Sequence, residues 1–199
     1  MWFNDGGSAW NDTKCIPVVD DPAQLDAPCT VEIAGDSGID DCDVGLMCWD
    51  TDAENEGTCV ALCLGSPGEP TCASGDPCTL YQYGFGICIP SCDPLMSDCD
   101  PDSMCIPSDQ VFVCVLDASG DDGQVHTPCM FANGCDPGLY YIDSASAKEC
   151  DPMSSLCCEP FCDVSLPNTC PGEGQECIHW YEGMAPSKYE NLGICTLPG

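Results

Sequence analysis

Cysteine constrains this chain more than any other feature, because 22 of its 199 residues are cysteine. A share above about 8–10% in a chain of modest length is typical of a disulfide scaffold. No two cysteines are separated by two residues, so the C-x2-C spacing of zinc knuckles, thioredoxin-like motifs and haem attachment sites is absent. We therefore expect disulfides, formed in an oxidising compartment, in place of thiolate-bound metal.

The segment from Cys63 to Cys92 shows how one unit is built. Its first four cysteines have the spacing C-x8-C-x5-C-x9-C. About thirty residues bury too little apolar surface to offset chain entropy, whereas a disulfide closing a loop of about 15 residues contributes roughly 3 kcal/mol. Glycines and prolines between the cysteines predict turns. The expected fold class is a small disulfide-rich repeat protein of short β-hairpins and loops, with little or no helix, in an elongated array of modules.

The chain contains an internal duplication. A Pro-Cys pair and the run CDVGLM in the first half, at Cys29 and Cys42, match a Pro-Cys pair and the run CDPGLY in the second, at Cys129 and Cys135. Two further landmarks correspond: C-x3-C at 59–63 and 158–162, and Gly-Ile-Cys at 86–88 and 193–195. One landmark differs, since Tyr141 stands where the first half has Cys48.

The duplication divides the chain into segments. We expect modules 1 to 5 at 29–62, 63–91, 92–114, 129–161 and 162–199, with an acidic linker at 115–128 between the halves. Cys15 corresponds in position to Cys114, which closes module 3, but lacks the cysteines that precede Cys114. Residues 1–28 are therefore interpreted as an N-terminal segment that ends a truncated module, with more of the parent protein upstream.

Disulfide pairing is predicted within each four-cysteine module. Sequence alone allows three connectivities for four cysteines, of which we favour first-to-third and second-to-fourth. The pairs expected on this basis in modules 2 and 3 are Cys63–Cys78, Cys72–Cys88, Cys92–Cys105 and Cys99–Cys114. Cys15 and one of the five cysteines of module 4, for which we take Cys157, are then left to pair together, to pair between chains or to remain free.

Charge limits the partners of the chain. Its 34 Asp and Glu residues face three lysines, for a net charge of −31, and nothing could neutralise the phosphates of a nucleic acid. No apolar run is long enough to span a membrane, and the first residues lack the basic and apolar regions of a signal peptide. The composition favours an extracellular or cell-surface protein whose signal peptide is not in this chain. The acidic excess serves solubility, cations or basic partners.

Several long motifs carry a resemblance: NDGGSAWNDTKC, GIDDCDVGLMCW, GTCVALC, CDPLMSDC, FVCVLDASG, CDPGLY, CCEPFCD and the closing W-Y-E-G-M-A-P-x-x-Y-E. Over essentially its whole length the chain resembles a group of predicted secreted bacterial cysteine-rich proteins of unknown function. Some members carry an automatic ribulose-phosphate epimerase label. Such enzymes are eight-stranded α/β barrels of roughly 200 residues or more. The frequent turn residues and the lack of helical periodicity predict a different scaffold here.

Acidic loops are candidate calcium sites. Calcium takes six to eight oxygen ligands, which clustered carboxylates and loop carbonyls supply without a fixed motif. The candidate ligands are Asp36, Asp40, Asp41 and Asp43 in module 1 and Asp98, Asp100 and Asp102 in module 3. The alternative interpretation is that these are solvated carboxylates in turns, with no cofactor bound.

Aromatic residues follow the third cysteine of most modules. They are Trp49, Tyr81, Phe112, Trp180 and Tyr181. They form either a stacking face for an extracellular glycan or, the interpretation we favour, a cover over the disulfides of modules that lack a core. His126 and His179 have no cysteine, serine or carboxylate pattern beside them, and we interpret them as surface or packing residues.

These observations favour a non-catalytic extracellular or cell-surface protein. It would act as a structural or interaction module that binds protein partners or its own copies, as a subunit of an extracellular assembly. The alternative is a secreted module that binds calcium or a glycan. An enzyme is the third interpretation, and we expect none, because the sequence assembles no nucleophile-base pair and no metal triad.

Overall fold

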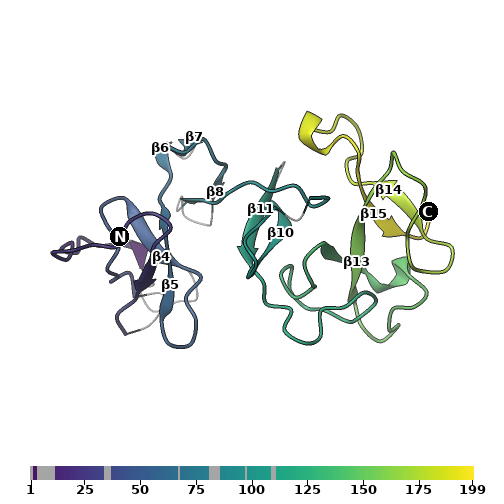
Figure 1. Ribbon diagram of the computed structural model, residues 1–199, viewed down its shortest axis with the longest axis horizontal. Helices are drawn as coiled ribbons and strands as arrows, with labels where there is room; N and C mark the ends of the chain where they lie inside the picture. Colours follow the sequence, from purple (N-terminus) through teal and green to yellow (C-terminus); the bar gives the residue numbers. More distant parts are fainter. Residues whose placement is uncertain are drawn as a thin grey trace. The chain divides into compact units, whose positions relative to one another are not determined.

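The computed structural model describes residues 2–3, 12–33, 37–66, 68–80, 86–96, 98–108 and 111–199. In these residues the chain forms short antiparallel strands, loops and two single-turn 3-10 helices, with no α-helix. The prediction of a disulfide-rich fold of short hairpins with little or no helix is confirmed. The chain divides into two compact units, Met1–Pro90 and Ser91–Gly199, and Figure 1 shows their strands.

Unit 1 contains one three-stranded sheet and three strand pairs. The sheet has the order β3-β5-β4, with β5 in the middle. The strands are β1 (Trp2–Phe3), β2 (Asp12–Thr13), β3 (Pro28–Thr30), β4 (Leu46–Trp49), β5 (Glu56–Ala61), β6 (Leu64–Ser66), β7 (Glu69–Thr71), β8 (Cys78–Leu80) and β9 (Gly86–Cys88). The pairs are β1 with β2, β6 with β7, and β8 with β9.

Unit 2 contains a hairpin and a four-stranded sheet. The hairpin joins β10 to β11, and the sheet has the order β12-β13-β15-β14. The elements are β10 (Ser103–Ser108), β11 (Val111–Leu116), β12 (Leu139–Asp143), η2 (Ser144–Ser146), β13 (Leu156–Asp163), β14 (Glu176–His179), η3 (Ser187–Tyr189) and β15 (Leu192–Thr196).

The backbone repeats as the sequence does. In unit 1 the Cys59 amide donates to the carbonyl of Ala27 at 3.0 Å, and in unit 2 the Cys158 amide donates to the carbonyl of Thr127 at 3.0 Å. Strand β5 therefore corresponds to β13. Met47 lies opposite Val60 in the first sheet, at the register position that Tyr140 and Glu159 occupy in the second.

One register recurs in the hairpins of the modules: the third cysteine lies directly opposite the fourth. The opposed pairs are Cys48 with Cys59, Cys78 with Cys88, Cys105 with Cys114, and Cys177 with Cys195. Directly opposed side chains on neighbouring strands are about 4.5–5.5 Å apart at Cβ. Since the two cysteines of each pair belong to different bridges, the two bridges of a module lie side by side.

Sulfur makes up most of the small cores. In module 1 the buried cluster is Val31 with Cys29, Cys42, Cys48 and Cys59. These sulfurs pack where a larger domain would place aliphatic side chains. This arrangement explains how modules of this size reach a buried interior.

Unit 2 also has an aromatic core where its modules meet. Phe112 of module 3 is fully buried. Its ring lies 5.6 Å from that of Phe161, 5.6 Å from that of Trp180 and 5.1 Å from that of Tyr189, centroid to centroid. Edge-to-face and tilted contacts at these distances add to the stability that burial alone gives.

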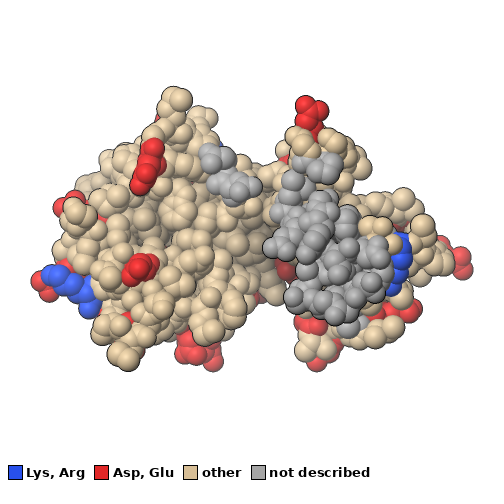
Figure 2. All heavy atoms as spheres, turned by 180° about the vertical axis from the view of Figure 1, so that it is seen from behind, with Lys and Arg blue, Asp and Glu red and all other residues tan. Residues whose placement is uncertain are grey.

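Carboxylates are scattered over the surface. On the face in Figure 2, Asp and Glu residues lie at separate points among uncharged ones. Lys148 and Glu173, both exposed, form an ion pair at 3.1 Å. Within the described residues, no helix has the length or the apolar character that a bilayer span requires.

Candidate functional site

The sulfur atoms are the chemically distinctive groups of the fold. All 22 cysteines lie in the described residues, and 20 of them form ten disulfides. The four pairs expected in modules 2 and 3 are present: Cys63–Cys78, Cys72–Cys88, Cys92–Cys105 and Cys99–Cys114. Modules 1 and 5 have the same connectivity, through Cys29–Cys48, Cys42–Cys59, Cys162–Cys177 and Cys170–Cys195.

Module 4 departs from this connectivity and corrects one expectation. Cys157 is not the unpaired cysteine, because it is bonded to Cys150, and Cys129 is the one without a sulfur partner. The reason is the duplication. Cys129 occupies the place of Cys29, whose partner in module 1 is Cys48. Tyr141 stands in that partner's place, opposite Cys158. Module 4 therefore lacks the cysteine that would form a first-to-third bridge with Cys129.

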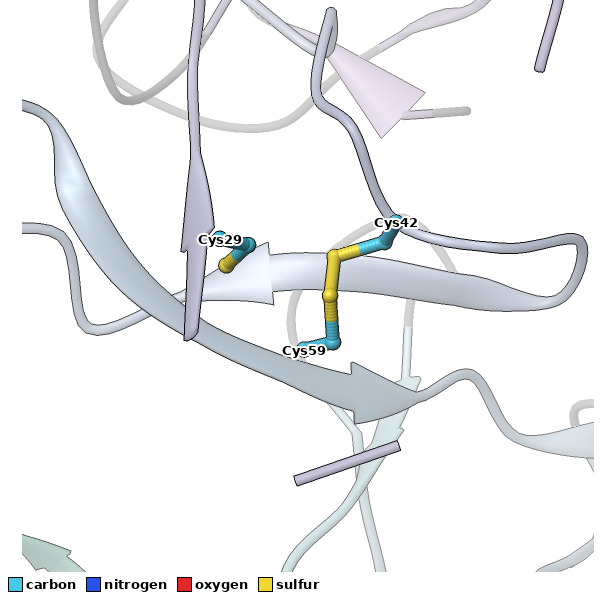
Figure 3. A group of neighbouring side chains, drawn as sticks. All are labelled: Cys29, Cys42 and Cys59. Atoms are coloured by element: carbon cyan, nitrogen blue, oxygen red, sulfur yellow. A yellow bond between two sulfur atoms is a disulfide. The ribbon is translucent and has the colours of Figure 1, made fainter. Parts of the chain in front are cut away.

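Each module brings its cysteines into a tight group. In module 1 the sulfurs of Cys29, Cys42 and Cys59 all lie within 4.8 Å of one another. Figure 3 shows the Cys42–Cys59 bridge with the Cys29 side chain close beside it. Such a group has the compactness of a metal site, but bridged sulfurs carry no thiolate charge. Metal binding by cysteine needs the thiolate, so the bridges account for these groups.

The group in module 4 differs because one of its three sulfurs is a thiol. The sulfurs of Cys129, Cys135 and Cys158 lie within 4.8 Å of one another. Cys135 and Cys158 are bridged and fully buried, and the Cys129 residue is 9% exposed. Burial raises the pKa of the Cys129 thiol above its ordinary value. The group therefore places a buried thiol beside a disulfide.

Cys15, by contrast, is an exposed thiol. It lines a pocket of about 250 Å³ with apolar neighbours that include Ile16, Val44 and Leu46. Val44 is 80% exposed. The expectation that Cys15 is left over from the pairing agrees with this placement.

A buried carboxylate lies in module 4 that the sequence analysis does not single out. Glu159 on β13 is fully buried. The Gln175 amide donates to its Oε2 at 2.9 Å, and His126 Nε2 lies 3.3 Å from its Oε1. Burial raises the pKa of the Glu159 carboxyl, the Gln175 hydrogen bond and the proximity of His126 lower it, and the proximity of Glu149 raises it. The interpretation of His126 as a packing residue therefore omits its contact with this carboxylate.

The duplication contains the signal that could have identified Glu159. Its counterpart in module 1 is Val60, a partly buried apolar residue on β5. His126 likewise corresponds to Asp26. Both residues have a positive φ, 66° and 64°, and both donate their amide to the following β5 or β13 cysteine carbonyl. At equivalent places in the two halves, His126 and buried Glu159 thus replace exposed Asp26 and the apolar Val60.

The proposed calcium ligands of module 1 are occupied by hydrogen bonds. Asp40, 7% exposed, accepts the amides of Cys42 at 3.2 Å and Cys48 at 3.0 Å. Asp41 accepts the amide of Thr30 at 2.8 Å and its hydroxyl at 3.0 Å. These carboxylates shape the loop that presents Cys42. Burial raises the pKa of the Asp40 carboxyl, and its two amide donors oppose the rise.

The other proposed calcium ligands are divided among several places. Asp43 accepts the Val44 amide at 2.7 Å, and Asp98 accepts the Asp93 amide at 2.8 Å. Asp100 lines a small pocket with Met104 and Pro137. The remaining candidates are Asp102, an exposed turn residue, and Asp36, which lies outside the described residues.

The aromatic residues proposed as a glycan platform take different positions. Phe112 is fully buried and so cannot stack on a sugar, while Trp180 and Tyr181 are half-buried against the same core. Trp49 is half-buried on β4, and Tyr81 lies outside the described residues. In unit 2 these residues therefore act as core, the interpretation that the sequence favours.

Comparisons of the chain with protein-family profiles, with curated proteins and with solved structures gave no match.

Proposed function

We propose that the chain is a non-catalytic structural or interaction protein that works outside the cell or at its surface, as a subunit of a covalently linked assembly. The observation that carries the proposal is the replacement of apolar cores by paired sulfurs, ten bridges in 199 residues. Bridges of this kind form and persist in oxidising surroundings, and the thiol pools of the cytosol oppose them.

The modular construction supports an interaction role. Modules that are each stabilised by their own bridges do not need a common core, and repeated modules supply surface for binding. Several large apolar side chains remain exposed on these small modules, among them Met130 at 80%, Phe131 at 67% and Met153 at 91%. Exposed apolar groups gain free energy when a partner covers them.

Cys15 supplies the covalent link in this proposal. Its thiol is exposed and lies beside the apolar side chains of Ile16 and Val44. A contact that buries these side chains would hold two thiols close enough for oxidation to a disulfide. The partner we propose is a second copy of the chain, because each copy then contributes the same thiol and the same apolar neighbours.

The large negative charge sets a condition on this contact. Two chains of net charge −31 repel each other at low ionic strength, but the Debye length falls to about 8 Å at physiological salt. We therefore expect the link to form at physiological or higher ionic strength and to form poorly in dilute buffer.

The experiment is electrophoresis of the protein secreted by an oxidising host, run without reductant after blocking of free thiols. We expect a disulfide-linked dimer from the wild-type protein and only monomer from Cys15→Ser. Cys129→Ser is the matched control and keeps the dimer, because the Cys129 thiol is buried. A wild-type protein that stays monomeric, with Cys15 open to maleimide, would contradict the covalent assembly. Epimerase turnover of pentose phosphates by the pure protein would contradict the non-catalytic part.

A further inference from the structure

Module 4 holds a thiol and a disulfide in one buried group. The sulfurs of Cys129, Cys135 and Cys158 lie within 4.8 Å of one another, and only the last two are bonded. In module 1 the corresponding group is Cys29, Cys42 and Cys59, in which Cys29 is held by its own bridge to Cys48. In module 4 Tyr141 replaces that partner. Of the three sulfurs in the module 4 group, two form one bridge and the third remains a thiol.

The backbone holds this thiol beside the bridge. The Cys129 amide donates to the carbonyl of Leu156 at 3.3 Å, and the Cys158 amide donates to the carbonyl of Thr127 at 3.0 Å. The segment that carries Cys129 therefore runs along β13, which carries Cys158. Apolar residues that include Leu139 share the buried cluster of the three cysteines. The thiol can reach the bridge without unfolding of the strand.

We propose that Cys129 exchanges reversibly with the Cys135–Cys158 disulfide, so that module 4 interconverts between disulfide isomers. The Cys129 thiolate forms a bond to the sulfur of Cys135 or of Cys158. The existing S–S bond breaks, and its electron pair leaves on the other sulfur. The proton that Cys129 loses on ionisation ends on this departing thiolate, so the reaction needs no oxidant and no reductant.

The exchange relocates the free thiol within the module. Attack on Cys158 leaves the thiol on Cys135, in the loop before β12, and attack on Cys135 leaves it on Cys158, in β13. The number of bridges is the same in every isomer. What changes is whether Cys129, at the start of module 4, is tied covalently to the rest of the module. In the structure no bridge joins Cys129 to it.

The Cys150–Cys157 bridge is placed outside this exchange. It closes a separate loop between η2 and β13, and its sulfurs are not in the group formed by Cys129, Cys135 and Cys158. The proposed exchange therefore involves only these three sulfurs. It connects three pairings: the one in the structure and two isomers of it.

The test uses Cys15→Ser, which removes the exposed thiol and leaves Cys129 as the one thiol of the chain. The protein is held at pH 8 without denaturant, quenched in acid to stop exchange, unfolded and labelled with a maleimide under acid. Peptic peptides then show which cysteine carries the label. We expect label on Cys135 or Cys158 in more than about one molecule in a hundred, a ratio that corresponds to a difference of about 2.8 kcal/mol between isomers. Label on Cys129 alone would overturn the proposal.

Tyr141→Cys, made in the same background, is the matched control. It places a cysteine at the position that Cys48 occupies in module 1. This position lies opposite Cys158, as Cys48 lies opposite Cys59. We expect a new bridge from Cys129 to this position, no free thiol, and no label at any residue. Label on Cys135 or Cys158 that persists in this variant would show that the exchange does not start from Cys129 and would also overturn the proposal. Because neither variant contains Cys15, the result is independent of the covalent dimer.

Discussion

The hydroxyl of Tyr189 accepts a hydrogen bond from the backbone amide of Phe112 at 3.2 Å, and the two rings pack 5.1 Å apart. The same hydroxyl donates to the carbonyl of Cys92 at 3.0 Å. One buried side chain near the C-terminus thus joins two backbone groups of module 3 that lie 77 and 97 residues earlier in the chain. Within unit 2 the modules are held to one another by this contact and by the aromatic core around it.

Tyr189→Phe tests this joint. The variant keeps the ring but leaves the Phe112 amide and the Cys92 carbonyl without their partner, and an unsatisfied buried group costs about 1–3 kcal/mol. We expect a loss of free energy of unfolding of this size, measured by denaturant titration. Ser187→Ala, an exposed change in the same 3-10 helix, is the control and should alter stability by less than about 0.5 kcal/mol. An unchanged stability in Tyr189→Phe would show that the hydroxyl is not buried in solution.

Glu159→Gln tests the buried carboxylate by its pH dependence. Burial raises the pKa of Glu159 in the folded protein above the ordinary value of 4.5. A carboxyl whose pKa is higher in the folded state favours folding when it is protonated, and that contribution is lost as the pH rises through the folded pKa. Glutamine resembles the protonated form at every pH. The stability of Glu159→Gln relative to the wild type should therefore increase as the pH rises from 4.5.

Thermal melting over this pH range is the measurement for Glu159. Glu176→Gln, an exposed carboxyl on β14, should show no such trend. If the wild type instead gains stability over Glu159→Gln as the pH rises, attraction to His126 outweighs burial and the assignment of the cause is wrong.

Asp40→Asn separates a structural carboxylate from a calcium ligand. Asp40 accepts the amides of Cys42 and Cys48, and hydrogen bonds to a charged group contribute about 1.5–3 kcal/mol each. We expect the variant to melt at a lower temperature than the wild type, by the same amount in calcium and in chelator. Glu54→Gln, an exposed change in the same unit, should melt as the wild type does. A wild-type melting temperature that rises with calcium would favour the calcium-binding alternative.

Disulfide connectivity could be predicted from the sequence because it depends on local spacing. In modules 2 and 3 the third and fourth cysteines lie on the two strands of a hairpin, directly opposite each other. Each of the two then bonds to an earlier cysteine in the adjoining loop, which gives first-to-third and second-to-fourth bridges. The two strands of each hairpin lie close together in the sequence, so short-range information is sufficient.

Module 4 could not be predicted by counting cysteines. The choice of Cys157 as the unpaired residue is wrong because Cys150 and Cys157 form an added bridge that closes its own loop. The tyrosine at position 141 predicts the unpaired residue correctly, because it replaces the cysteine that would pair with Cys129. Position in the duplication decides the pairing there, and the number of cysteines does not.

The buried carboxylate and the aromatic core depend on contacts between distant segments. Glu159 follows two cysteines on β13 and meets Gln175 only when module 5 folds against module 4. Phe112 and Tyr189 meet in the same way. Local sequence does not predict which of these distant segments contact each other. From its charge alone Glu159 is expected to be exposed, whereas the fold buries it.

The account depends most on paired sulfurs taking the place of apolar cores. The direct measurement is a disulfide map, by mass spectrometry, of protein secreted into an oxidising medium, alkylated and digested in acid without reduction. We predict first-to-third and second-to-fourth bridges in modules 1, 2, 3 and 5, with Cys63 bonded to Cys78 and Cys72 to Cys88. A map in which most cysteines are alkylated, or in which Cys63 bonds to Cys72, would contradict it.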